Sequence, residues 1–253
     1  MLRSAFLGML LALGATVSGC AAAGTDLAEE ASDSVDAVTA EAALVVSAMD
    51  GITASTTPEE AANAAAANAG TFWTEGCYTY LIDGASVTYE MTSCSGPFGL
   101  AQVTGSITVT YRPTTSSYGF DITTTNLAIG DASVSYTLMA DVATDARNVR
   151  VTSSGNATGR RGHVVTHEGT YDLRWNGSSS CAGLDGSWST TVGARTFTTQ
   201  VAGWQRCGSS CPTGGSVTYS GPAASVIITY DGSSEASFTN GEGGTGTIPL
   251  FCE

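Results

Sequence analysis

Residues 106–111 read Ser-Ile-Thr-Val-Thr-Tyr, and variants of this phrase recur along the chain. In each copy, apolar or tyrosine residues alternate with hydroxyl residues, so the two kinds of side chain fall on opposite faces of an extended strand. One buried face and one hydrated face are typical of an antiparallel sheet. The spacing between copies is irregular, which argues against a solenoid with a fixed period. The other copies are residues 86–89, 133–136, 216–219 and 225–230.

The whole segment 71–253 continues this period of two. Val, Ile, Thr and Tyr alternate with Ser and Thr, and pairs of glycine, asparagine or aspartate interrupt the pattern as turn signals. The segment therefore predicts a mainly β domain, an antiparallel meander of roughly ten to twelve strands. An open curved sheet, a barrel and a sandwich all fit this pattern. The predicted turns include Asp83-Gly84, Gly155-Asn156, Asn176-Gly177 and Asp231-Gly232.

Residues 20–70 form a different region, rich in alanine and acidic residues. Apolar residues between 28 and 52 recur at spacings of three and four, which predicts an amphipathic helix with a single apolar stripe. The acidic residues fall off this stripe, so we expect them on a solvated face. They are Asp26, Glu29, Glu30, Asp33, Asp36, Glu41 and Asp50. The helix could pack on the protein's own sheet, form a partly ordered tether, or pair with a partner as a coiled coil.

A second, shorter helix is predicted after Thr57-Pro58-Glu59-Glu60. Thr57 suits the N-cap, Pro58 suits the first helical position, and Glu60 completes a capping box.

The N-terminus has the layout of an export signal: Arg3, then an apolar run, then small residues before Cys20. The apolar run is about eleven residues long, too short to span a bilayer. Val17-Ser18-Gly19-Cys20 resembles the lipobox of bacterial prelipoproteins, and the resemblance covers only this signal region. It implies cleavage of residues 1–19 and lipidation of Cys20, which would anchor the chain in a membrane. Ala21 after the cysteine implies sorting to an outer membrane in a cell that has one, on its periplasmic or its surface side.

Six cysteines remain beside Cys20, and an even number in an exported chain predicts three disulfides. Hairpin geometry favours Cys77 with Cys94, which flank the turn at Asp83-Gly84, and Cys181 with Cys207, which lie symmetrically about Gly193-Ala194. Cys211 and Cys252 would then pair. The alternative set joins Cys207 to Cys211 and Cys181 to Cys252. Three residues separate Cys207 from Cys211 in a β context, which favours a structural over a redox role.

The chain has nine arginines, no lysine and 23 acidic residues, with a formal net charge of −14. Loss of Arg3 with the signal would lower this to −15, since −14 − 1 = −15. Such a balance argues against nucleic-acid binding, which needs clustered cations. The absence of lysine excludes Schiff-base and P-loop chemistry that depends on it.

The familiar catalytic motifs, such as GxSxG and HExxH, are missing from the sequence. The strongest cluster is His163, His167 and Glu168. On a strand the two histidines would share a face about 13 Å apart, too far to bind one zinc ion, and Glu168 would point to the other face. We therefore predict no catalytic residue, no metal and no cofactor. The Ser/Thr face could bind a glycan beside Tyr171, Trp175, Trp188 and Trp204, or simply face water.

These features predict a membrane-anchored bacterial lipoprotein whose β-domain, residues 71–253, has a non-enzymatic binding or structural role in the cell envelope. One alternative is a carrier of an apolar ligand, held in an open β-barrel and covered by the helix. An envelope hydrolase is the third. The lipid on Cys20 is the predicted membrane contact, and a glycan, a lipid and a protein all remain open as ligands.

Overall fold

The computed structural model describes residues 19–49, 52–53, 56–114, 118–130, 132–143, 148–159, 161–176 and 180–252. Residues 1–18 of the predicted export signal lie outside the described residues, as does the side chain of Cys20.

Thirteen antiparallel strands form one sheet in which every strand pairs with its neighbours in sequence order. Within the described residues, β1 and β13 do not pair with each other, so the sheet is open. The prediction of a mainly β meander is confirmed, and the open sheet is the one of the three proposed architectures that forms. The strands are β1 (Tyr78–Asp83), β2 (Ser86–Cys94), β3 (Val103–Pro113), β4 (Tyr118–Ile129), β5 (Ala132–Val142), β6 (Asn148–Thr158), β7 (Val164–Asn176), β8 (Cys181–Val192), β9 (Arg195–Cys207), β10 (Gly214–Ser220), β11 (Ser225–Thr229), β12 (Glu235–Asn240) and β13 (Thr245–Pro249).

Two α-helices, α1 (Gly19–Met49) and α2 (Pro58–Asn68), precede the sheet, with short 3-10 turns at η1 (Ala69–Thr71) and η2 (Pro97–Gly99). The capping box of α2 is confirmed. Thr57 Oγ1 accepts a hydrogen bond from the Glu60 amide at 3.2 Å, and a Glu60 carboxylate oxygen accepts one from the Thr57 amide at 2.9 Å. These bonds to the carboxylate lower the pKa of Glu60.

The repeated phrase places its residues as predicted. In β3, Ile107, Val109 and Tyr111 are buried on the inner face of the sheet, whereas Thr110 is exposed. The same alternation holds in β2, β5, β10 and β11.

Glycine at 155 does not mark a turn, so that prediction is wrong. Gly155 lies inside β6, directly opposite Tyr136 of β5. A Cβ atom at this position would lie 2.5 Å from the Tyr136 ring. The glycine therefore makes room for an aromatic ring that lies across it, a device that natural sheets use to cover a glycine. The turns at Asp83-Gly84 and Gly193-Ala194 form as predicted, whereas Gly177 lies outside the described residues.

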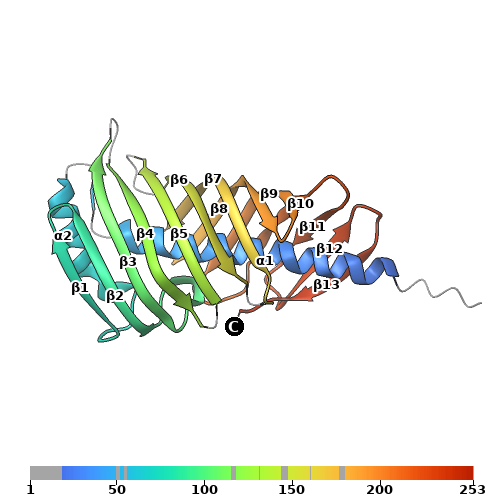
Figure 1. Cartoon of the computed structure of the whole chain (residues 1–253), viewed down its shortest axis with the longest axis horizontal. Helices are drawn as coiled ribbons and strands as arrows, with labels where there is room; N and C mark the ends of the chain where they lie inside the picture. The colour runs from blue at the N-terminus through green and yellow to red at the C-terminus, as the bar shows by residue number, and fades with distance from the viewer. Residues whose placement is uncertain are drawn as a thin grey trace, which may run out of the picture.

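Helix α1 runs along the length of the sheet, and the strands cross it while the sheet curves around it (Figure 1). It contacts β5, β7, β8 and β10 to β13 as well as α2 and η2. From Leu27 to Met49 no side chain is exposed, and only Glu29, Asp36 and Ser47 are partly accessible. The prediction that the acidic residues of this helix face solvent holds for Asp26, which is exposed, but it is wrong for Glu30, Asp33 and Glu41, which are buried. Of the three arrangements left open for the helix, packing on the protein's own sheet is the one observed.

Candidate functional site

The buried carboxylates of α1 each meet a basic side chain from the sheet or its loops. Glu30 pairs with Arg195, and Asp33 contacts both Arg161 at 3.2 Å and His163 Nδ1 at 2.9 Å. Because an unpaired charge in a protein interior is costly, these partners are what allow an acidic helix to be enclosed.

Glu41, like Asp33, is fully buried. One of its oxygens lies 2.5 Å from His167 Nε2 of β7, and the other accepts a hydrogen bond from the Tyr171 hydroxyl at 3.3 Å. Burial, reinforced by the negative charge of Glu41, raises the pKa of Tyr171 well above its usual value. Tyr136 has its pKa raised for the same two reasons, and its hydroxyl donates to the Ala37 carbonyl.

Ser153, His167 and Glu41 have the residue types of a hydrolase triad but not its geometry. Ser153 Oγ lies 2.9 Å from His167 Nε2, the same nitrogen that faces Glu41. In a triad the nucleophile and the acid occupy opposite ring nitrogens, so that the histidine can take a proton on one side while it is oriented from the other. All three side chains are also at most 2% exposed, which keeps substrate away. The cluster is therefore a structural network.

The two histidines do not act together. His163 lies just before β7 and reaches Asp33, whereas His167 reaches Glu41 two turns further along α1. Glu168 is exposed on the outer face. Among the residues that the structure describes, no group of three or more His, Cys, Asp or Glu side chains could hold a metal ion.

Sequence reasoning identified neither these partners nor a second polar contact between α1 and the sheet. Ser34 Oγ accepts a hydrogen bond from the Trp188 indole at 2.9 Å and lies 2.9 Å from Thr190 Oγ1. Thr190 and Thr199 are polar residues on the inner, apolar face of β8 and β9, where both are fully buried. Polar residues at core positions of a period-two pattern are the signal that could have located this contact.

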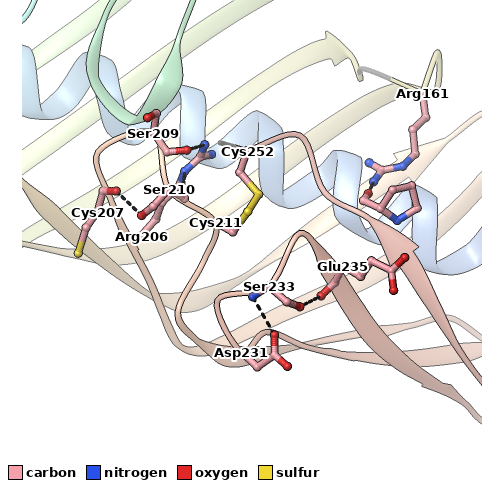
Figure 2. The surroundings of a disulfide bond; sticks show 11 residues. Arg161, Arg206, Cys207, Ser209, Ser210, Cys211, Asp231, Ser233, Glu235 and Cys252 are labelled. Atoms are coloured by element: carbon pink, nitrogen blue, oxygen red, sulfur yellow. Dashed lines mark hydrogen bonds between the residues drawn. A yellow bond between two sulfur atoms is a disulfide. The ribbon is translucent and has the colours of Figure 1, made fainter.

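Three disulfides form, with the pairing that the hairpin geometry favours: Cys77–Cys94, Cys181–Cys207 and Cys211–Cys252. Cys181 and Cys207 are directly opposite each other in β8 and β9. The alternative pairing of Cys207 with Cys211 is wrong, and with it any redox role for CGSSC, since each cysteine bonds elsewhere. Figure 2 shows the Cys211–Cys252 bond beside Arg206 and the loop from Cys207 to Ser210.

A cavity of about 920 Å³ lies at the C-terminal half of α1, which contributes Val46 to its wall. Its remaining walls come from separate segments: residues 71–72 before β1, the η2 loop at 95–101, Trp175 of β7 with Ser180 before β8, residues 206–209 at the end of β9, and the C-terminal residues 251–252. Pockets that hold small molecules typically measure about 300–1,000 Å³, so this cavity is of the right size for one.

All three disulfides border this cavity. Cys94 immediately precedes the η2 loop, Cys181 and Cys207 adjoin Ser180 and Arg206 of the lining, and Cys252 is itself a lining residue. The cross-links therefore hold in place four of the segments that shape the cavity. A site whose walls are fixed beforehand loses less conformational entropy when a ligand binds.

Two lining residues have strained backbones. Phe98 has φ = +53° and Ser180 has φ = +52°, in the left-handed region that side chains other than glycine rarely adopt. Such residues cost about 1–3 kcal/mol each and concentrate at ligand-binding and catalytic sites.

The lining combines aromatic rings, hydroxyls and the guanidinium of Arg206. Phe72, Phe98, Trp175 and Phe251 supply the rings, and the rings of Phe72 and Trp175 lie 5.8 Å apart. Among the lining residues that the structure describes, Arg206 is the charged one; its Nε donates to the Ser210 carbonyl at 2.9 Å and its Nη2 to the Ser209 carbonyl at 3.2 Å.

The aromatic residues considered for a glycan surface separate into two groups. Tyr171, Trp188 and Trp204 are buried against the core, so they cannot stack on a sugar at the hydroxyl face. Only Trp175 is partly exposed, and it lines the cavity instead.

No protein-family model matches this chain, and neither a curated protein nor a solved structure matches it. In the described part of the chain, no helix combines the length and apolar character needed to cross a membrane.

Proposed function

We propose that this chain is an envelope lipoprotein whose β-domain binds a small molecule in the cavity at the C-terminal half of α1. The observation that carries the proposal is the convergence of all three disulfides on the segments that line the cavity. Their placement stabilises the walls of the cavity.

The chemistry of the lining favours binding over catalysis. The described lining residues include hydroxyls and an arginine, but among them there is no histidine or carboxylate that could act as a general base toward a bound molecule. The acid–base groups that do cluster, around Glu41, are enclosed between α1 and the sheet.

An apolar ligand carried beneath the helix was an alternative from the sequence. Because α1 itself occupies the inner face of the sheet, we place such a ligand in the cavity beside Val46 rather than along the whole helix.

The proposed lipid on Cys20 defines where the site lies relative to the membrane. An α-helix rises about 1.5 Å per residue, so Val46 is about 39 Å along the axis of α1 from Cys20.

The anchor is tested by Cys20→Ala. We expect the variant to leave the membrane fraction and remain soluble, because one residue supplies the attachment. A variant that still sediments with membranes would place the anchor elsewhere.

Ligand binding is tested by native mass spectrometry of the Cys20→Ala chain purified without detergent. We expect a population whose mass exceeds that of the polypeptide by one small molecule, which is released on unfolding. A single species at the polypeptide mass, from cells and also after incubation with an extract of them, would contradict a binding function.

A further inference from the structure

We propose that the ligand of the cavity is an uncharged, ring-bearing apolar molecule. This inference rests on the proposed binding function and names the chemical class that the lining selects.

Aromatic side chains in the walls of the cavity favour a ligand that has rings. Phe72, Phe98, Trp175 and Phe251 come from four different segments of the chain and are brought to one cavity. Aromatic rings attract one another in tilted and offset arrangements, as the Phe72–Trp175 pair already shows with 56° between the ring planes. A ligand with rings of its own can make such contacts on several sides at once.

The charges of the lining and of the whole chain disfavour an ionic ligand. Among the lining residues that the structure describes there is no carboxylate, so they would not compensate a cationic ligand for the loss of its hydration. The Arg206 guanidinium braces the β9–β10 loop through the Ser209 and Ser210 carbonyls, a structural task that does not require a ligand. The net charge of −14 on the whole chain also disfavours the approach of an anion.

The volume of the cavity and its rigid wall favour a compact ligand. The volume of about 920 Å³ suits a compact molecule of several rings, and Phe98, which is 5% exposed, is held by a strained backbone that fixes one wall. Gly96 allows this loop to lie against Trp73, since a Cβ atom at Gly96 would be 2.3 Å from the Trp73 ring. Such a rigid wall suits a flat ligand better than a flexible chain, which would have to adopt one conformation to fit.

The test is a matched series of three naphthalene probes: 1-naphthalenemethanol, 1-naphthaleneacetate and 1-naphthylmethylammonium. Their affinities for the Cys20→Ala full chain are measured by isothermal titration calorimetry. We expect the uncharged alcohol to bind at least tenfold more tightly than either ion. An ion that binds as tightly as the alcohol, or more tightly, would overturn the uncharged class.

Two substitutions locate the binding. Trp175→Ala should weaken binding of the alcohol about threefold to tenfold, which corresponds to the loss of one aromatic contact, and Trp175→Phe should restore most of it. Tyr80→Ala removes an aromatic side chain that is 51% exposed on β1, outside the lining, and should leave the affinity unchanged. Equal effects of Trp175→Ala and Tyr80→Ala would overturn the assignment to this cavity.

The results of these measurements distinguish a failure of the ring-bearing class from a failure of the proposed binding function. A co-purified molecule with no binding of the alcohol, or a co-purified acyl chain without rings, would overturn the ring-bearing class while leaving a binding function in place. A protein that carries no co-purified molecule and binds none of the three probes would overturn both the ring-bearing class and the binding function.

Discussion

The buried contact between Glu41 and His167 is expected to contribute strongly to the stability of the fold. We predict that His167→Ala lowers the free energy of unfolding by about 3–5 kcal/mol, because it leaves the Glu41 carboxylate buried without its basic partner. Urea denaturation followed by circular dichroism measures the loss.

Two variants serve as controls for this prediction. His163→Ala should cost clearly less, because His163 is partly accessible and Asp33 keeps its contact with Arg161. The double variant Glu41→Leu/His167→Leu should recover much of the lost stability, since apolar residues can replace a buried ion pair. If the double variant is no more stable than His167→Ala, the cost does not arise from an unpaired charge.

At the residue scale, the apolar alternation of the strands could be predicted, but the burial of the acidic residues could not. The helical periodicity indicates which positions of α1 differ in polarity, and it placed Glu30, Asp33 and Glu41 off the apolar stripe. It contains no information about Arg161, Arg195 or His167, which lie more than a hundred residues away and contact these carboxylates.

At the scale of the single helix, α2 depends on its capping box. We predict that Thr57→Ala lowers the free energy of unfolding by about 1 kcal/mol, because the Glu60 amide loses its acceptor. Thr57→Ser keeps a hydroxyl at the N-cap and should stay close to the native value. Urea midpoints that are equal for the alanine and serine variants would refute this role of the cap.

The η2 loop should be sensitive to one added methyl group. Gly96→Ala would place a Cβ atom 2.3 Å from the Trp73 ring, so the loop must shift or Trp73 must move. Overpacking of this kind costs about 1–3 kcal/mol, which a thermal melt would detect.

Gly70→Ala is the matched control for that substitution, since its nearest neighbour, the Tyr78 hydroxyl, would lie at an ordinary distance of 3.6 Å. If the two alanine variants melt at the same temperature, the contact between Gly96 and Trp73 does not constrain the loop.

At this scale the sequence correctly indicated two hairpins, the capping box and two disulfides, because each depends on residues close in sequence or symmetric about a turn. The third disulfide, Cys211–Cys252, followed by elimination. It misread Gly155 because a glycine that accommodates the ring of Tyr136 looks the same in sequence as a glycine in a turn. The cavity was not predictable, since its lining comes from segments spread from Val46 to Cys252.

The whole molecule should lose stability in alkali. Burial raises the pKa of several tyrosines: that of Tyr118 to about 12, and those of Tyr111, Tyr136 and Tyr171 well above the usual 10. Below pH 10 both folded and unfolded states keep these phenols protonated, so the tyrosines add no pH dependence there. Above pH 10 the unfolded state releases protons that the folded state retains, and stability falls.

Each fully shifted tyrosine contributes up to about 1.4 kcal/mol per pH unit in this window. We expect similar urea midpoints at pH 8 and pH 9 and a steep decrease by pH 11, with a thiol assay to verify that the disulfides stay intact. A midpoint unchanged at pH 11 would mean that the tyrosines ionise within the folded protein.

The enclosure of α1 has a consequence for the order of events during biosynthesis. The helix is among the first segments to be made, yet its packing partners extend to β13 at the other end of the chain. The helix therefore cannot be fully buried until almost the entire polypeptide has been made, and contacts so distant in sequence slow folding. We expect the carboxylates of α1 to keep the helix hydrated before it is enclosed, because their basic partners, at residues 161–195, are made well after it.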